Sequence, residues 1–333
     1  MFVLGMGLAL VFGFPLVMLL FGAVLLAVLL RGLGELVAKI TPLSGRWGVA
    51  VVLLLLVGAG VLVGVFAAPA IAARVADVAD RVPEAAGKAW EKLLSTPVGP
   101  YLPKEPLGGD EGFTLTTGQI TRRLSSAMTV AFGVLGDLAV AVIVGIYLAI
   151  SPAQYHAGLI HLVPKRRRGR AEEVIDALTH ALRWWLVGRF SSMAIIGVAS
   201  GVGLWLLGVP LAGTLGVLTG LLCFVPFVGP LVSLVPPMLF AWVESSSLAL
   251  WVLALYMGVQ LLESYVVTPL IDQRTVLLPA ALVIASQAVI GFAAGPVGVM
   301  LAVPFAVVIM VLVQMLYVQD VLDDDEIEVE GVE

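Results

Sequence analysis

The chain has little charge and a single cysteine, and each shortage excludes a class of protein. Charged residues make up 12% of its 333 positions, about half the share that is usual in soluble globular domains. Hydrophobic residues make up 60%, more apolar surface than a soluble fold can hide. With Cys223 alone, an internal disulfide and a cysteine-rich metal site are excluded. Because the apolar runs are continuous rather than alternating, we predict an all-α polytopic membrane protein and not a β-barrel.

The sequence also lacks the motifs of common enzymes and nucleotide-driven pumps. There is no G-x-x-x-x-G-K-[ST] loop, so we do not expect ATP to drive the protein directly. There is no H-E-x-x-H pair, nucleophile elbow or pair of catalytic carboxylates. We therefore expect no enzymatic activity, no cofactor, no metal site and no nucleic-acid partner.

The first half of the chain predicts three kinds of segment. Residues 1–69 form N-terminal transmembrane helices, in which Gly13-Phe14-Pro15 separates a short first helix from a second one that ends near Ile40. Residues 70–126 place apolar side chains at helical spacing between charged ones, which predicts an extracytoplasmic helical segment. A further transmembrane helix follows over residues 127–150.

A dense basic cluster sets the orientation. The run from Lys165 to Arg170 contains five basic residues, and short loops rich in lysine and arginine stay in the cytoplasm. Residues 151–187 are thus predicted to be a cytoplasmic, amphipathic segment, although such a cluster could also touch anionic lipid head groups. Both termini are then cytoplasmic, and residues 319–333 form an acidic, solvated tail. We expect no signal peptide, because the first residues lack a basic n-region and a cleavage site.

Residues 188–318 form the predicted transport core, which contains two hairpins interrupted by glycine and proline, 211–243 and 277–317. Before the turn at Pro226 to Pro230, the first hairpin has a helix that would rise only about 22 Å. That is short of the roughly 30 Å hydrocarbon core of a bilayer, which favours a re-entrant hairpin over a pair of proline-kinked ordinary spans.

The second hairpin repeats this plan, with its turn at Gly295-Pro296. Paired segments that are interrupted by glycine and proline are the usual sequence signal of a substrate site in secondary transporters. Polar groups at membrane depth are costly, so those near the interruptions are functional candidates. The candidates for substrate contact or gating are Pro226, Gly229, Pro230, Gln260, Glu263, Arg274, Gln287 and Asp137.

Several of these candidates have two interpretations. Glu263 shares a helix face with Tyr256 and Gln260 and is expected near Arg274 or Arg189. It is then either a polar gate or proton-linked carboxylate, or half of a structural ion pair. Asp137 either binds a proton or cation or lines a subunit contact. Gln287, with its neighbour Ser286, either hydrogen-bonds a polar cargo or satisfies backbone groups in a packed bundle.

The motifs at the hairpins resemble those of the AI-2E family of bacterial membrane proteins, called autoinducer-2 exporters after one member. The matching pieces are Gly208-Val209-Pro210, Val225-Pro226-Phe227-Val228-Gly229-Pro230, Gln260-x-x-Glu263 with Pro269, Val276-Leu277-Leu278-Pro279, and Gly295-Pro296-Val297-Gly298 with Pro304. The resemblance implies a secondary transporter or exporter of a small polar molecule in the bacterial cytoplasmic (inner) membrane. It also implies a ring-like homo-oligomer, for which a pentamer is the expectation.

The chain departs from the family at positions that could touch the cargo. Gly188-Arg189 stands where Gly-Gln is frequent, and Glu263-Ser264-Tyr265 stands where Glu-x-Asn is favoured. Three functions therefore stay open. One is export of an autoinducer-2-like metabolite. Another is sodium/proton-type antiport with Glu263 or Asp137 as the proton carrier. The third is a membrane scaffold that binds a partner through residues 70–126.

Overall fold

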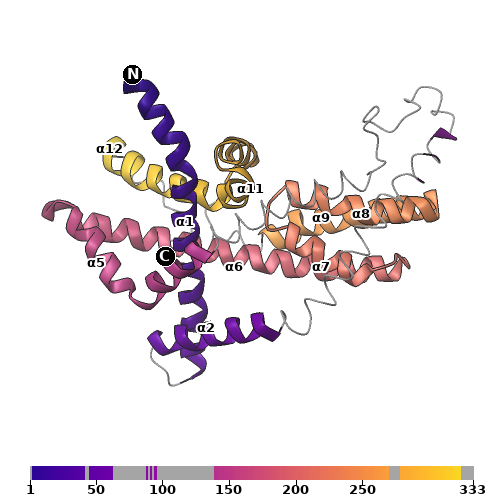
Figure 1. The fold of residues 1–333 in the computed structure, drawn as a ribbon, viewed down its shortest axis with the longest axis horizontal. Helices are drawn as coiled ribbons and strands as arrows, with labels where there is room; N and C mark the ends of the chain where they lie inside the picture. Colours follow the sequence, from indigo (N-terminus) through magenta and orange to yellow (C-terminus); the bar gives the residue numbers. More distant parts are fainter. Residues whose placement is uncertain are drawn as a thin grey trace, which may run out of the picture. The chain divides into compact units, whose positions relative to one another are not determined.

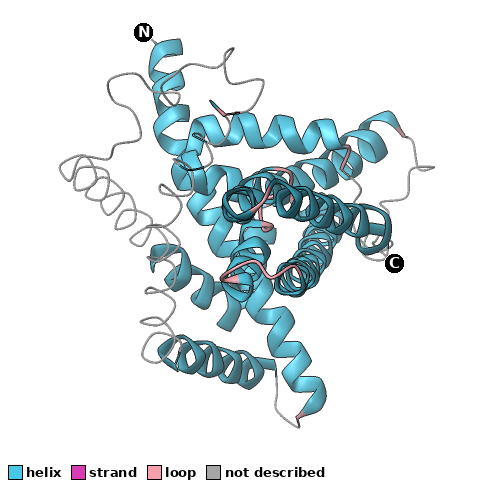
Figure 2. Cartoon of the chain, turned by 90° about the vertical axis from the view of Figure 1, so that its right-hand side faces the viewer, coloured by secondary structure: helices cyan, strands magenta, loops and turns pink. Residues whose placement is uncertain are grey.

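A computed structural model describes residues 2–41, 45–62, 139–269 and 278–323, together with positions 88, 91, 94 and 95. Within these ranges helix is the only regular structure (Figure 2). Four helices there are long and apolar enough to cross a membrane, or five if one sharply bent pair is a single span. The prediction of a polytopic helical protein is confirmed at this level. Asp137, Arg274 and nearly all of the predicted extracytoplasmic segment lie outside the described residues.

The N-terminal part is one helix rather than two. Helix α1 runs from Phe2 to Ile40 with Pro15 inside it, so the predicted turn at Gly13-Phe14-Pro15 is wrong. A proline removes one backbone hydrogen bond, and packing against neighbouring helices can offset that loss in a membrane protein. Such packing begins directly after the proline, because Met18 is fully buried against Ile290 and Ala302.

The chain forms two compact units. Helix α6, Arg168–Leu206, contributes its first part to unit 1 and its last part to unit 2. Because it is continuous, the end of the predicted cytoplasmic segment 151–187 and the start of the predicted transport core 188–318 lie in one helix. Unit 1 comprises residues 1–60, 133–189 and 269–333, and unit 2 comprises residues 61–132 and 190–268.

Unit 1 is built on the contact of α1 with helix α11, Ala280–Leu312 (Figure 1). Helix α2, Gly45–Leu62, packs on α1 where Gly34 and Gly48 meet, and a Cβ on either glycine would overlap backbone of the other helix. The first part of α6 buries its apolar face in this unit. This face of α6 packs against residues 307–315 near the end of α11. The buried residues of the contact are Val174, Ala177, Ala181, Val307, Val311 and Met315.

The Arg170 side chain on α6 binds the last described residues of unit 1. Arg170 contacts Glu173 at 2.9 Å and Asp320 at 2.9 Å, and it donates to the carbonyl of Met315 at 2.9 Å. Met315 lies in a π-helical segment, η6, Val313–Gln319, which leads into the short helix α12, Asp320–Leu322. The first residues of the predicted solvated tail are therefore helical and held on α6.

Helix α11 is broken at Gly295, where φ is 65° and ψ is −153°. A Cβ on Gly298 would lie 2.5 Å from the carbonyl oxygen of Ile290, whereas eight residues of continuous helix would separate these positions by about 12 Å. The chain thus folds back at Gly295-Pro296, at the position where the sequence places the turn. Insertion of this hairpin into a bilayer as a re-entrant element stays a prediction.

Unit 2 contains the first predicted hairpin as two short helices, α7, Ala212–Leu222, and α8, Val228–Glu244. Helix α8 packs alongside both α7 and helix α9, Ser246–Leu262 (Figure 1). Ser245 begins α9 by accepting a hydrogen bond from the Leu248 amide at 3.0 Å. Pro236 and Pro237 lie inside α8 without ending it.

The outward faces of unit 2 are as apolar as its core. Val198, Leu221, Leu231 and Trp251 each expose more than 60% of their surface. Contiguous apolar surface of this kind marks contact with lipid or protein rather than with water. The core that these helices enclose is formed by Leu204, Val209, Ala212, Leu215, Phe240, Ala241, Ala249, Val252 and Tyr256.

Candidate functional site

The turn between α7 and α8 begins three residues earlier than the sequence suggests. It covers residues 223–227, so Gly229 and Pro230 lie in the first turn of α8 rather than in the connection. At that end of a helix a missing N–H costs little, because the first amides have no partner within the helix. The Gly229 amide donates back to the Val225 carbonyl at 2.9 Å, which closes the connection.

Gly229 is needed for space and not for a left-handed backbone. The positive φ in this turn, 62°, belongs to Phe227, and the φ of Gly229 is not positive. A Cβ on Gly229 would overlap the carbonyl of Leu222 and lie 2.9 Å from the Cα of Cys223. Glycine therefore allows α8 to start directly against the last turn of α7.

A buried polar cluster lies behind this turn and joins all three short helices of unit 2. The Tyr256 hydroxyl on α9 is 2.8 Å from the Thr219 hydroxyl on α7, and both side chains are buried. The same Tyr256 hydroxyl donates to the Ser233 carbonyl on α8 at 3.4 Å. Ser233 donates in turn to the Pro230 carbonyl at 3.0 Å, in the first turn of α8. We call Thr219, Ser233 and Tyr256 the Tyr256 cluster.

Sequence reasoning singled out Tyr256 but missed its two partners. Thr219 and Ser233 are hydroxyl residues within apolar helices on either side of the predicted turn. That position was the available signal, because a polar group at membrane depth needs a partner or a function. The pairing itself depends on which helix faces become neighbours.

The other residues that share a face with Tyr256 have a different environment. Gln260 donates to the Glu263 carboxylate at 2.9 Å in an exposed contact, whereas Tyr256 is buried. Glu263 begins a π-helical segment, η5, Glu263–Val267. Such segments are rare and occur often at functional sites. The predicted face thus divides into a buried hydroxyl and an accessible amide–carboxylate pair.

Gln287 lies in unit 1, on the part of α11 that precedes the break at Gly295, and only 6% of its surface is exposed. Its neighbour Ser286 donates to the Val283 carbonyl at 2.8 Å, within its own helix. Ser286 thus satisfies a backbone group, one of the two alternatives considered from the sequence. Gln287 is a buried amide about two helical turns before the break at Gly295.

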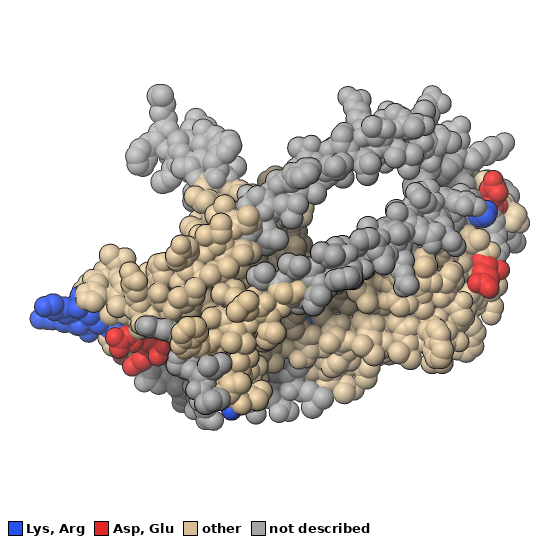
Figure 3. All heavy atoms as spheres, turned by 60° about the horizontal axis from the view of Figure 1, so that its bottom comes forward, with Lys and Arg blue, Asp and Glu red and all other residues tan. Residues whose placement is uncertain are grey.

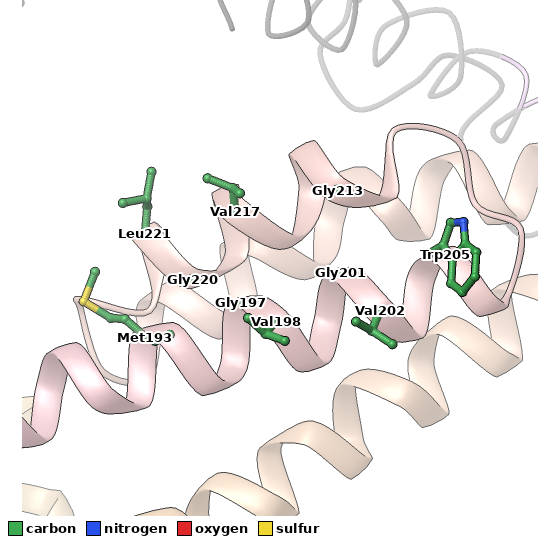
Figure 4. Close-up of a pocket in the computed structure, with 11 residues that line it drawn as sticks. Met193, Gly197, Val198, Gly201, Val202, Trp205, Gly213, Val217, Gly220 and Leu221 are labelled. Atoms are coloured by element: carbon green, nitrogen blue, oxygen red, sulfur yellow. The ribbon is translucent and has the colours of Figure 1, made fainter. Parts of the chain in front are cut away.

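Unit 2 also has an apolar groove of about 600 Å³ between α6 and α7. Figure 4 shows Val202 and Trp205 on α6 and Val217 and Leu221 on α7 along it. Thr219 is two residues from both Val217 and Leu221, so it points to the opposite side of α7. The groove is consequently separate from the Tyr256 cluster and has the chemistry to hold hydrocarbon rather than a polar solute.

Helices α6 and α7 contact each other through four glycines, Gly197 and Gly201 on α6 and Gly216 and Gly220 on α7. Each pair has the G-x-x-x-G spacing that lets membrane helices approach closely. A Cβ on Gly216 would overlap the Cα of Gly201, and one on Gly220 would lie 2.8 Å from the Met193 carbonyl. Sequence reasoning did not use this spacing, although it was visible in the chain.

Comparison with known proteins agrees with the resemblance that the motifs suggested. The sequence model of the AI-2E family transporters matches residues 1–317. A Bacillus subtilis (strain 168) protein named as a transport protein, YrrI, is 28% identical over 46% of this chain and 43% of its own length. Another from the same organism, YueF, is 21% identical over 60% of this chain and 55% of its own. The chain thus spans about half the length of these relatives. With the family match covering nearly every residue, and with helices suited to spanning a bilayer, the chain belongs to the AI-2E transporter family.

Proposed function

We propose that this protein exports a small polar molecule, of the autoinducer-2 type, across the bacterial cytoplasmic membrane as a secondary transporter. The observation that carries the proposal is the Tyr256 cluster, a hydrogen-bonded polar group buried in apolar helices directly behind a helix break. In a bilayer, broken helices are tolerated where protein or a hydrated cavity covers them. Substrate sites of secondary transporters are built at such breaks.

The proposed roles follow from the chemistry of each group. The hydroxyls of Thr219 and Tyr256 can each donate and accept a hydrogen bond, so they can exchange their mutual bond for one to a polyhydroxylated solute. Gly229, between Pro226 and Pro230, lets the α7–α8 turn close tightly and serves as a gate. Gln287, about two helical turns before the break in α11, is a candidate second contact, and Asp137 and Arg274 stay candidates from the sequence.

Flux into liposomes that contain the purified protein tests this proposal. We expect uptake of autoinducer-2 or a related small polar metabolite without ATP, and slower uptake by Tyr256→Phe, which loses both hydrogen bonds of the hydroxyl. Each bond contributes on the order of 1 kcal/mol, so the loss of both corresponds to a decrease of roughly thirtyfold in flux. Tyr265→Phe is the matched control, because Tyr265 is 76% exposed. Equal rates of uptake by the two variants would show that the Tyr256 cluster is not part of the transport pathway.

Cation antiport is the second candidate, and the Gln260–Glu263 pair at the start of η5 favours it. A carboxylate that is accessible and held by an amide can exchange a proton for a sodium ion. Under this alternative, a cation flux depends on a pH or sodium gradient, and Glu263→Gln removes that dependence. The liposomes then take up neither autoinducer-2 nor related small polar metabolites. A protein that moves neither metabolites nor cations would instead fit a scaffold that binds a partner through residues 70–126.

We further propose the topology and assembly that the sequence suggests. Both termini and residues 151–187 are cytoplasmic, residues 70–126 are outside, and residues 188–318 form the transport core of each protomer in a homo-oligomer, a pentamer. Single-cysteine labelling in a Cys223→Ser background tests the topology, and labelling of position 84 from the cytoplasm alone would refute it. Mass measurement in nanodiscs tests the oligomer.

A further inference from the structure

Helix α5, Pro152–Leu162, leaves the preceding apolar helix at a right angle. The helix Ala139–Ile150 and α5 are bent by 89° at Ser151. Residue Ser151 is not helical, with φ −125° and ψ 51°, and Pro152 starts the new helix. If the first of these helices runs along the bilayer normal, α5 runs parallel to the bilayer surface. That is the orientation of an interfacial helix.

One face of α5 is apolar and uncovered. Tyr155, Leu159 and Leu162 have i, i+4, i+7 spacing, which places them on one side of the helix. They expose 42%, 56% and 83% of their surfaces, while Ile160, on another side, is buried. Within the described parts of the chain, this side of the helix is thus exposed, increasingly toward its C-terminal end. Burial of Ile160 holds α5 to the protein and leaves the apolar side outward.

Basic residues follow this face at the end of α5. Lys165, Arg166 and Arg167 form a short 3-10 turn, η4, and all three are exposed. Figure 3 shows Lys and Arg side chains gathered at one edge of the visible face. By contrast, Arg168 turns back to donate to the carbonyls of Val163 at 3.2 Å and His161 at 3.4 Å. The basic run therefore divides into a structural part and an outward part.

We propose that the outward part of this segment is a binding site for anionic phospholipid head groups. The α5 surface, formed by Tyr155, Leu159, Leu162, Lys165, Arg166 and Arg167, would bury its apolar side chains at the level of the acyl chains and pair its basic side chains with lipid phosphates. An in-plane helix with an apolar face and adjacent basic residues is the pattern of a peripheral membrane anchor. A soluble acidic partner fits less well, because its carboxylates would leave the three apolar side chains without contacts.

The test uses the full-length protein in nanodiscs with a fluorophore on one cysteine, in a Cys223→Ser background. Gly158 lies between Tyr155 and Leu162 on the apolar side, and a Cβ there meets nothing within 4 Å, so Gly158→Cys is tolerated. Ala157→Cys is the matched control, because Ala157 is exposed but lies two residues from both Tyr155 and Leu159 and thus points to the other side. Lipids with brominated acyl chains, carrying phosphatidylglycerol or phosphatidylcholine head groups, serve as quenchers.

We expect brominated phosphatidylglycerol to quench the label at position 158 strongly and the label at position 157 weakly. Phosphatidylglycerol should exceed phosphatidylcholine in apparent affinity by about fivefold or more, the effect of one or more basic side chains near an anionic surface. High salt should reduce this preference. Equal quenching by the two lipids would overturn the head-group site. Absence of quenching at position 158 would overturn the proposal and assign the apolar face to a second copy or a soluble protein.

A charge-removing variant checks the basic side chains themselves. Lys165→Gln/Arg166→Gln/Arg167→Gln should bring the phosphatidylglycerol preference down to the phosphatidylcholine level, whereas Lys165→Arg/Arg166→Lys/Arg167→Lys should keep it. Basic residues also influence orientation in the membrane, so the neutral variant could insert incorrectly. In that case the comparison of phosphatidylglycerol with phosphatidylcholine, made on the protein that keeps its basic residues, decides whether the head-group site exists. A neutral variant that inserts correctly and keeps the full preference would contradict the proposal.

Discussion

Gly229→Val should abolish transport while the protein still inserts into the membrane. The Cβ of any residue at this position would overlap the carbonyl of Leu222 and crowd the Cα of Cys223. These are backbone atoms at the end of α7, so no side-chain rotation can relieve the clash, and α8 must move away from α7. Overpacking of this kind costs about 1–3 kcal/mol or more, enough to displace the α7–α8 turn and the hydrogen bond from Ser233 to Pro230 behind it.

The comparison that isolates this effect is with other glycine substitutions in the same hairpin. Gly229→Ala carries the offending Cβ and should show most of the loss, measured as flux into liposomes at equal protein incorporation. Gly213→Ala, on α7, adds a Cβ that meets nothing within 4 Å and should transport normally. Normal flux by Gly229→Ala would show that the turn does not need this close approach, and failure of Gly213→Ala would show that the assay reports general damage to α7.

Gly216→Leu should destabilise unit 2 more than any other single change between α6 and α7. Its Cβ would overlap the Cα of Gly201 and lie 2.8 Å from the carbonyl of Gly197, so both sides of the contact are backbone. The two helices would have to separate, with loss of packing along the G-x-x-x-G pairs. A decrease of about 3 kcal/mol or more in the free energy of unfolding is expected.

Unfolding by SDS in mixed micelles, followed by tryptophan fluorescence, measures this decrease. Gly258→Leu is the control, because Gly258 on α9 has nothing within 4 Å of an added Cβ. The midpoint of Gly216→Leu should fall well below that of Gly258→Leu. Equal midpoints would mean that α6 and α7 do not approach through these glycines in the membrane.

The breaks in the helices were predictable where glycine and proline act together. Pro226 with Gly229 and Pro230, and Gly295 with Pro296, mark the two places where the chain turns back. Pro236 and Pro237 have no glycine beside them, and α8 continues through them. Helix α1 also continues through Gly13-Phe14-Pro15, although both residue types are present there. The free-energy cost of a proline within a helix is a local property. Whether the helix continues depends on whether the packing around it stabilises the helix by more than that cost.

The candidate site was predictable only in part, for a related reason. Gln260 and Glu263 pair within one helix at i, i+3 spacing, so their contact follows from local geometry. Thr219 and Tyr256 pair across two helices separated by 37 positions in the chain. No periodicity in either helix indicates which hydroxyl the other will meet.

By itself, the sequence determined the membrane class, the helical state, the turn at Gly295-Pro296 and the family, because these depend on composition, length and local backbone chemistry. Tertiary structure decided which side chains are partners and which glycines cannot be replaced. Gly229 and Gly213 belong to the same hairpin and look alike in the sequence, yet one faces backbone and the other open space. That difference arises only from the approach of a neighbouring helix, since the absence of a Cβ has a consequence only where other atoms occupy its place.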